Sequence, residues 1–215
     1  MLEKGELEEL KSRLKDEFSD YYEIAGGQNY RYRHLLTTRK LVLKLMQQPG
    51  IEDKDFDEKV VEISALFHDI GRKEDINDGF LDPMETHEGH DETGKEIIAE
   101  YVQDFADSEQ LEKIERVVGN HHSEAELVEG KIVQDADDLS NFGVNNLWRS
   151  IHYSSDYERT LQEAIDYFWN QQIDQYQEKI DQMYFDFTKQ KAEQRLQRLK
   201  DTMSDIEEEI NAEDL

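Results

Sequence analysis

Apolar side chains recur every three or four residues along most of the chain, and this spacing limits the fold more than any other feature. It is the spacing that places side chains on one face of an α-helix. Only 2 prolines and 11 glycines occur among 215 residues, which leaves little material for the many tight turns of a β architecture. The sequence therefore predicts an all-α fold, a helical bundle with a long C-terminal helical extension.

The C-terminal part carries the longest apolar stripe. The stripe starts at Tyr157 and continues in steps of three or four residues to Phe187, where it slips by five before it resumes at Ala192. It then continues to Ile210, and the acidic end from Asp205 onward is expected to fray. We predict one long helix from Tyr157 that packs through its aromatic stripe, and its later part offers a surface for a homodimer.

Shorter apolar segments, separated by glycine, proline or polar residues, make up the rest of the chain. We predict three units, namely an N-terminal helix packed on the core (1–24), the main helical domain (25–155) and the C-terminal helix (156–215). The helices expected before the last one cover residues 3–24, 30–48, 55–70, 87–104, 108–122, 131–139 and 144–153. Residues 71–86 lack helical periodicity and predict a long loop, and loops of that length are often functional.

The formal net charge of −27 limits the partners of this chain. Proteins that bind nucleic-acid polymers or anionic membranes present a basic face, so both functions are disfavoured. The segment Met1–Glu8 has no apolar signal region, and no stretch of the sequence is long enough to cross a bilayer. We therefore expect a cytoplasmic protein with a small-molecule partner, in which local cations offset the overall charge wherever an anion binds.

The sequence contains no cysteine, which excludes disulfides and thiolate metal ligands. A bound metal ion would be held by histidines and carboxylates, a ligand set that suits Mn²⁺, Mg²⁺, Fe²⁺, Co²⁺, Ni²⁺ or Zn²⁺. Most of the histidines lie at predicted helix ends or loop margins: His34, His68, His87, His90, His121 and His122. Converging side chains of this kind are a common way for a helical bundle to build a metal centre. The remaining histidine, His152, is expected to be structural.

The stretch Ala65–Arg72 contains the most distinctive pair. An apolar helical run delivers His68 and Asp69 side by side and stops at Gly71. Two such groups at a helix end can bind one cation from different directions, or they can form an ordinary ion pair at the edge of a core. Taken alone, the dipeptide favours the ordinary ion pair, and only the rest of the chain shifts the balance.

Four further motifs lie elsewhere in the chain. They are His34 early in a helix, His90-Asp91-Glu92-Thr93-Gly94 before a helix, His122-Ser123 after a helix, and Gln134-Asp135-Ala136-Asp137-Asp138-Leu139 at the end of an apolar run. Together with His68-Asp69, this ordered set resembles the HD superfamily of metal-dependent phosphohydrolases, and within it a subgroup with an Asp-Ala-Asp block. The resemblance covers roughly residues 25–155 and implies the helical bundle of an HD domain.

The resemblance implies a divalent metal ion, with Mn²⁺ favoured, held by four side chains: His34, His68, Asp69 and Asp135. It also implies catalytic roles for three side chains: Asp69, His90 and His122. The last two could bind a second metal ion or contact phosphate, and one ion is favoured because the motif of the subgroup centres on four ligands. His87 and His121 match the pattern less well, and we expect both at the surface.

The implied substrate is a small phosphorylated anion, most simply a nucleotide. We expect its phosphate to be bound by cations close to the motifs: Arg33, Arg72, Lys73 and Arg149. Arg31 also lies close to the motifs, and both it and Arg33 could pair with surface carboxylates instead of phosphate. The favoured activity is hydrolysis of a nucleoside triphosphate to monophosphate and pyrophosphate, and the alternatives are a nucleoside monophosphate phosphatase or a signalling-nucleotide hydrolase. Asp138 stands where the subgroup usually has arginine, which leaves the substrate open. A non-catalytic, metal-stabilised interaction module is the alternative of another class.

Overall fold

The computed structural model describes residues 1–82 and 89–215. Its α-helices are α1 (Lys4–Glu17), α2 (Tyr30–Leu45), α3 (Glu58–Phe67), α4 (His90–Val102), α5 (Ser108–Gly119), α6 (Val128–Ser140), α7 (Leu147–Asp156), α8 (Leu161–Tyr167), α9 (Ile173–Gln182) and α10 (Asp186–Asn211). Shorter helical turns are η1 (Ile70–Asp75) and η2 (Val144–Asn146), both 3₁₀, and the π-helical η3 (Phe168–Gln172). The predicted all-α class is confirmed.

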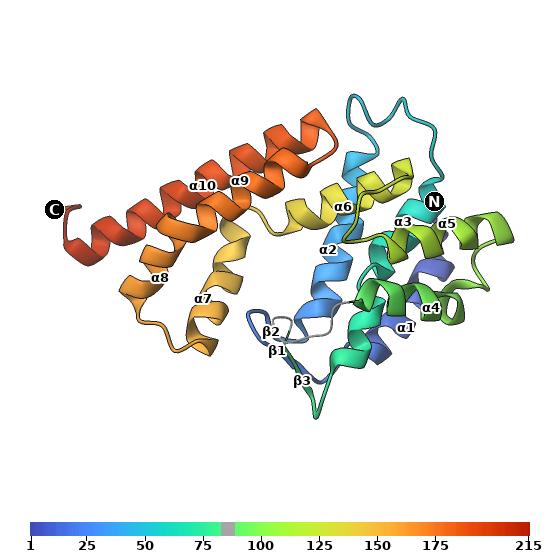
Figure 1. The fold of residues 1–215 in the computed structure, drawn as a ribbon, viewed down its shortest axis with the longest axis horizontal. Helices are drawn as coiled ribbons and strands as arrows, with labels where there is room; N and C mark the ends of the chain where they lie inside the picture. Colours follow the sequence, from blue (N-terminus) through green and yellow to red (C-terminus); the bar gives the residue numbers. More distant parts are fainter. Residues whose placement is uncertain (83–88) are drawn as a thin grey trace.

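The helices form two groups, α1 to α6 in a bundle and α7 to α10 extending to one side, so that the two chain ends lie far apart (Figure 1). One apolar cluster joins α1 to α3, α4 and α5. A second cluster joins α2, α3 and α6 to the C-terminal helices. α3 contributes to both clusters, and every residue from Val60 to Phe67 is buried. The end of α3 therefore lies inside the molecule, which is where the candidate site forms.

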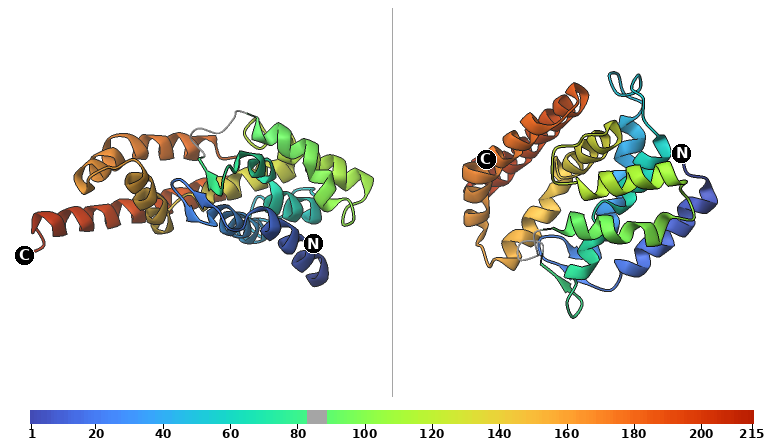
Figure 2. Two further views of the ribbon diagram at one scale, coloured as in Figure 1. Left: turned by 90° about the horizontal axis from the view of Figure 1, so that it is seen from below. Right: turned by 45° about the vertical axis from the view of Figure 1, so that its right-hand side comes forward.

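The prediction of one long C-terminal helix is wrong. α8 and α9 are joined through η3, and α10 then turns back and lies alongside α9 (Figures 1 and 2). The turn begins at Met183, whose backbone is extended (φ −58°, ψ 146°). The carboxylate of Asp135 accepts hydrogen bonds from the N–H groups of Tyr184 and Phe185, just before α10 begins. A side chain distant in the sequence thus stabilises the turn.

The apolar stripe of α10 faces its own chain. Its members Ala192, Leu196, Leu199 and Met203 are buried in the second apolar cluster. α10 is 26 residues long, and none of the helices among the described residues combines the length and apolar character needed to cross a bilayer. The homodimer and the fraying beyond Asp205 stay predictions.

The first helix ends at Glu17, not at Ile24 as predicted. Asp20 has a left-handed backbone (φ 61°), and β1 (Tyr22–Glu23) follows it. β1 pairs antiparallel with β2 (Gly27–Gln28) and parallel with β3 (Phe80–Leu81), so the expected loop over 71–86 contains both η1 and β3. The small sheet fixes the position of Glu23, which is fully buried beneath the candidate site.

Candidate metal centre

Side chains from α2, α6 and the end of α3 converge on one point inside the bundle. His34 lies in the first turns of α2, His68 is the C-terminal cap residue of α3, and Asp137 lies in α6. Asp69 follows His68 directly and precedes η1. The buried run of α3 carries His68 and Asp69 into the core, because the helix ends only at Phe67.

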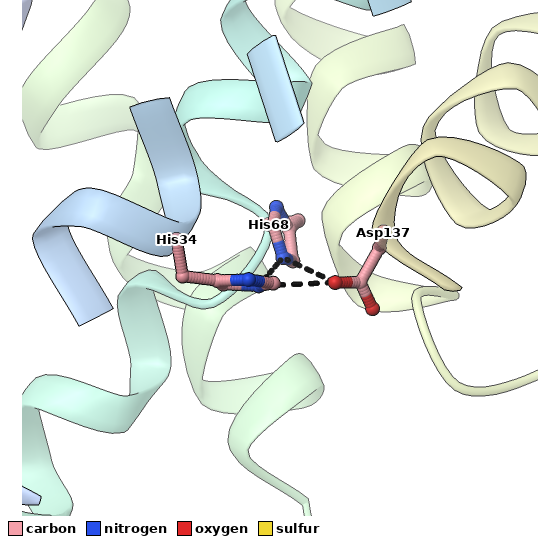
Figure 3. Close-up of side chains that lie close together, drawn as sticks. All are labelled: His34, His68 and Asp137. Atoms are coloured by element: carbon pink, nitrogen blue, oxygen red, sulfur yellow. Dashed lines mark hydrogen bonds and ion pairs between the residues drawn. The ribbon is translucent and has the colours of Figure 1, made fainter. Parts of the chain in front are cut away.

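The donor atoms of these side chains lie close together. Nε2 of His34 lies 3.2 Å from Nε2 of His68 and 3.0 Å from Oδ1 of Asp137 (Figure 3). His68 Nε2 lies 3.7 Å from the same Asp137 oxygen. Oδ2 of Asp69 lies 3.5 Å from His34 Nε2 and 3.3 Å from His68 Nε2. The two imidazoles and two carboxylates therefore face one another.

The second nitrogen of each ring has a partner that sets the direction of the first. His68 Nδ1 lies 3.1 Å from the carbonyl oxygen of Ala65, which can only accept, so Nδ1 carries the proton and Nε2 of the neutral ring carries a lone pair. His34 Nδ1 lies 3.3 Å from Oγ of Ser140. Partners of this kind orient histidine ligands in metal sites. Two Nε2 atoms that face each other at hydrogen-bond distance need a shared cation or a proton between them.

Asp69 is held in place by a buried arginine. Arg31 donates to Oδ2 of Asp69 and to Oε1 of Glu23, at 2.6 Å in each case. Burial would raise the pKa of Asp69, but Arg31 and His68 hold it well below its usual value. Asp69 is therefore ionised, and Arg31 pairs with buried carboxylates of the site and not with carboxylates at the surface.

The centre favours positive charge. Burial alone would lower the pKa of His68, yet Asp69 and Asp137 raise it to about 10. Burial would likewise raise the pKa of Asp137, but His121 and His34 hold it well below its usual value. In the absence of a metal ion, a proton on an imidazole compensates the two carboxylates. A divalent cation compensates the same charge without protonating the ring.

The spacing and chemistry of this group fit such a cation. Ligand atoms about 2.1 Å from one ion lie roughly 3.0–3.4 Å apart in octahedral or tetrahedral arrangements. The observed separations of 3.0–3.7 Å among His34, His68 and Asp137 are close to this range. Neutral imidazole and carboxylate are suitable ligands for the first-row divalent metals and, through oxygen, for Mg²⁺.

Asp135, the fourth ligand implied by the resemblance, lies elsewhere. Its carboxylate accepts from the N–H groups of Tyr184 and Phe185 and from the hydroxyl of Thr188, and among the described residues it joins none of the candidate metal-binding groups. Residues two apart on a helix are rotated by about 200°, so Asp135 and Asp137 cannot face the same partner. Asp137 occupies the position expected for Asp135, and Asp135 stabilises the start of α10.

We expect Asp135→Ala to destabilise the fold without removing a bound metal ion. The substitution leaves three donors at the start of α10 without their acceptor. The expected loss is about 1–3 kcal/mol in the free energy of unfolding, measured by urea denaturation. Metal content measured on the same preparation should equal that of the unaltered protein. A variant that keeps its stability but loses metal would contradict this assignment.

His121 is buried, in contrast to the surface position predicted for it. Its ring lies 4.4 Å from that of His68, and its Nε2 lies 3.4 Å from Oδ2 of Asp137. Both of its ring nitrogens are buried and have no hydrogen-bond partner within 1–82 and 89–215. The sequence signal for this residue was its place beside His122 at a helix end. His87, also predicted at the surface, lies outside the described residues.

His90 and His122 form a second pair beside the first group. Their Nε2 atoms lie 2.8 Å apart, and His90 Nε2 lies 3.7 Å from Oδ1 of Asp69. Burial and the nearby Arg72 lower the pKa of His90 to about 3, so its imidazole is neutral at pH 7. Asp69, His90 and His122 place their donor atoms within 4.8 Å of one another and could hold a second ion.

Glycine makes this second pair possible. A Cβ at Gly71 would lie 1.9 Å from the carbonyl oxygen of His90 and 2.7 Å from the backbone nitrogen of Gly94. Both atoms belong to the backbone of α4, so no side chain could move aside. The absence of a Cβ therefore lets α4 approach η1 closely enough to bring His90 beside Asp69.

The predicted phosphate-binding cations divide into two groups. Lys73 donates to the hydroxyl of Tyr101, at 2.7 Å, and lies away from the histidines, near α1. Arg72 lies beside Asp75, at 3.5 Å, and remains close to His90. Arg33 and Arg149 line one cavity together with His34. Of these residues, Lys73 has the placement least suited to the predicted role.

Two cavities share residues with the centre. The acidic cavity, of about 470 Å³, is lined by His121, His122, Glu124, Asp135, Asp137, Asp138 and Lys179 among others. Its lysine pairs with Asp138. The basic cavity, of about 460 Å³, is lined by Tyr30, Arg33, His34, Trp148 and Arg149 among others, and its lining within residues 1–82 and 89–215 contains no carboxylate. The basic cavity is therefore the better entrance for an anion.

Comparisons with known proteins concern the family and the fold of the chain. Residues 31–141 match the HD domain. Among curated protein sequences, none matches the chain. An HD-superfamily hydrolase from Bacillus thuringiensis has a similar structure, with a TM-score of 0.69 and 19% identity over 97% of this chain and 98% of that one.

Two further solved structures are similar over nearly the whole chain. YpgQ of Bacillus subtilis, in complex with ADP, has a TM-score of 0.62 and 20% identity over 94% of this chain and 97% of that one. A predicted HD superfamily hydrolase from an uncultured Thermotogales bacterium has a TM-score of 0.62 and 18% identity over 94% and 92%. These likenesses show a shared fold that includes the C-terminal helices. Because the HD domain match spans more than half of the sequence, the chain belongs to the HD superfamily.

Proposed function

We propose that this protein is a metal-dependent phosphohydrolase. The observation that supports this most strongly is the convergence of His34, His68, Asp69 and Asp137, whose donor atoms face one point inside the bundle. These four side chains are the proposed ligands. One ion is the simpler assignment, and His90 and His122 remain available for a second ion or for phosphate. Mn²⁺ is favoured among the divalent metals.

When bound, a divalent cation lowers the pKa of a water molecule and offsets negative charge on a phosphoryl group. The residues of the chain orient the metal ligands and set their charge. The Ala65 carbonyl and Ser140 direct the two imidazoles, and Arg31 holds Asp69 ionised. His90 is neutral and half of a close histidine pair, so a lone pair of this pair can accept a hydrogen bond.

The charges around the centre support an anionic substrate. The basic cavity presents Arg33 and Arg149 next to His34, in a protein whose overall charge is −27. The guanidinium of Arg149 lies 5.2 Å above the ring of Tyr30, which stacks on His34. Guanidinium groups bind two phosphate oxygens at once. We infer that phosphate enters from this side.

We infer further that the substrate is a nucleotide. The complex of the similar YpgQ with ADP supports this class, and Tyr30 and Trp148 supply aromatic surface along the basic cavity. Hydrolysis of a nucleoside triphosphate to monophosphate and pyrophosphate is the favoured reaction. Removal of phosphate from a monophosphate and hydrolysis of a signalling nucleotide are the alternatives.

The test is metal-dependent turnover by the purified full chain. The protein is treated with a chelator, its metal content is measured, and Mn²⁺ or another divalent ion is restored. Phosphate and pyrophosphate release are then assayed on nucleoside triphosphates, monophosphates and signalling nucleotides. We expect turnover only with metal, and pyrophosphate release identifies the favoured reaction. A folded, metal-loaded protein without turnover on any of these substrates would support a non-catalytic metal-stabilised module instead.

Arg33 provides a separate test of phosphate entry. Its side chain is exposed and lines the basic cavity. We expect Arg33→Gln to raise KM for the best substrate by roughly tenfold, with little change in kcat, because it removes one charge-assisted contact made in the ground state. Arg198→Gln, an equal change of charge at an exposed position on α10, is the control. Equal KM values for the two variants would place the phosphate elsewhere.

A further inference from the structure

A third cavity lies apart from the metal centre, between α7, α8 and α10. Its volume is about 350 Å³, within the range of small-molecule sites. Most of its wall is apolar, with Leu147, Ile151, Leu161, Ile165, Phe168 and Met203 among the lining residues. Within the described part of the chain, its lining shares no residue with the acidic cavity, the basic cavity or the histidine group. The proposed hydrolysis gives this cavity no role.

Two polar atoms in this apolar wall are buried without a partner. Nη1 of Arg159 and Oγ of Ser150 make no hydrogen bond in the described parts of the chain, and both residues line the cavity. Buried donors normally have acceptors, because a donor that loses its hydrogen bonds to water and gains none in the protein destabilises the fold. A bound molecule that carries an acceptor would satisfy donors of this kind.

Aromatic rings hold the guanidinium of Arg159. Its central carbon lies 4.1 Å from the ring centre of Tyr167 and 4.7 Å from that of Tyr153. The nearby acid Glu163 accepts instead from the N–H and hydroxyl of Thr160. Arg159 forms no ion pair with the described carboxylates, although the sequence contains 52 aspartates and glutamates. The cation is positioned but not neutralised.

We propose that this cavity binds a small amphipathic monoanion, an apolar body that carries one carboxylate. The carboxylate accepts from Arg159 Nη1 and from the Ser150 hydroxyl, and the body contacts the apolar wall. A neutral apolar molecule would leave both donors without an acceptor. A sugar or a free phosphate would leave the apolar wall against polar groups. The volume suits a molecule about the size of a medium-chain fatty acid.

The matched probes are octanoate and 1-octanol, which share an apolar body and differ in the charged group. Isothermal titration calorimetry with the full chain should show one saturable site for octanoate. We expect 1-octanol to bind roughly ten- to a hundredfold more weakly, since it cannot form the charge-assisted hydrogen bond. Equal affinities for the two probes, or no saturable binding of octanoate at millimolar concentrations, would overturn the assignment.

Three variants locate the site. Arg159→Gln should reduce the affinity for octanoate to that for 1-octanol, whereas Arg198→Gln, with the same change of charge at an exposed position, should leave it unchanged. Ala164→Phe should fill the cavity and block both probes. Thermal unfolding followed by circular dichroism checks that each variant is folded. If Ala164→Phe does not fold, the effect of Arg159→Gln on octanoate binding still tests the site.

Two outcomes count against the site. Unchanged octanoate binding in Arg159→Gln would show that the carboxylate binds elsewhere.

The second outcome concerns contact between two copies of the chain. Ile151 and Leu161 are 64% and 59% exposed at this surface. A dimer in analytical ultracentrifugation that Leu161→Asp dissociates, together with absent octanoate binding, would assign the cavity to contact between two copies of the chain.

Discussion

Asp137→Asn is expected to lower the affinity for the divalent cation by at least about a hundredfold and to reduce turnover accordingly. The substitution removes one of two carboxylates that compensate the cation and keeps the size of the side chain. Loss of a residue that only orients a metal ligand already costs 10- to 100-fold in affinity, and loss of a ligand should cost more. Metal content after dialysis and turnover at saturating Mn²⁺ are the measurements.

Asp138→Asn is the matched control for this variant. Asp138 is the next residue on α6, undergoes the same change of charge, and pairs with Lys179 instead of facing the histidines. We expect it to keep its metal and most of its turnover. If Asp138→Asn loses metal as completely as Asp137→Asn, the effect comes from the overall charge of α6 and not from coordination. If Asp137→Asn keeps its metal, the proposed ligand set is wrong.

Gly71→Ala is expected to destabilise the protein by about 3 kcal/mol or more. The new Cβ would overlap the backbone of His90 and Gly94, so α4 has to move away from η1. That movement separates His90 from Asp69, and the histidine pair should lose its place beside the centre. Urea denaturation measures the free energy of unfolding, and turnover of the remaining folded protein reports on the site.

Gly5→Ala controls for the chemical change itself. A Cβ at Gly5, in the first turn of α1, meets nothing within 4 Å. Alanine is the better helix former, so this variant should be neutral or more stable by about 0.5–1 kcal/mol. A Gly71→Ala variant as stable as Gly5→Ala would show that α4 and η1 do not approach as closely as the structure indicates.

Much of the fold could be predicted from local pattern. The apolar run Val60–Phe67 identified α3 as a core helix, and all of it is buried. The long C-terminal stripe identified helical structure but not the turn at Met183, because the turn depends on Asp135, a residue distant in the sequence. The early end of α1 depends likewise on strand pairing between Tyr22 and Phe80.

The candidate site was predictable in kind and incomplete in detail. His34, His68 and Asp69 lie together as expected. The signal for Asp137 was present but weak: Val133, Asp137 and Ser140 share one face of α6, at helical spacing. In the structure Ser140 on that face contacts His34. The local sequence does not indicate which face of α6 packs toward α2, the face of Asp137 or the face of Asp135.

The sequence by itself determined that the chain is helical and that its chemistry rests on histidine and carboxylate, because both follow from residue type and spacing along one chain. Only the tertiary structure decided which carboxylate completes the centre. Both faces of α6 are buried, one against α2 and α3 and the other against α10. On the first face the carboxylate of Asp137 lies beside His34, and on the second the carboxylate of Asp135 accepts from the N–H of Phe185. A helix turns by about 200° over two residues, so packing between distant segments sends Asp137 to the histidines and Asp135 to the start of α10.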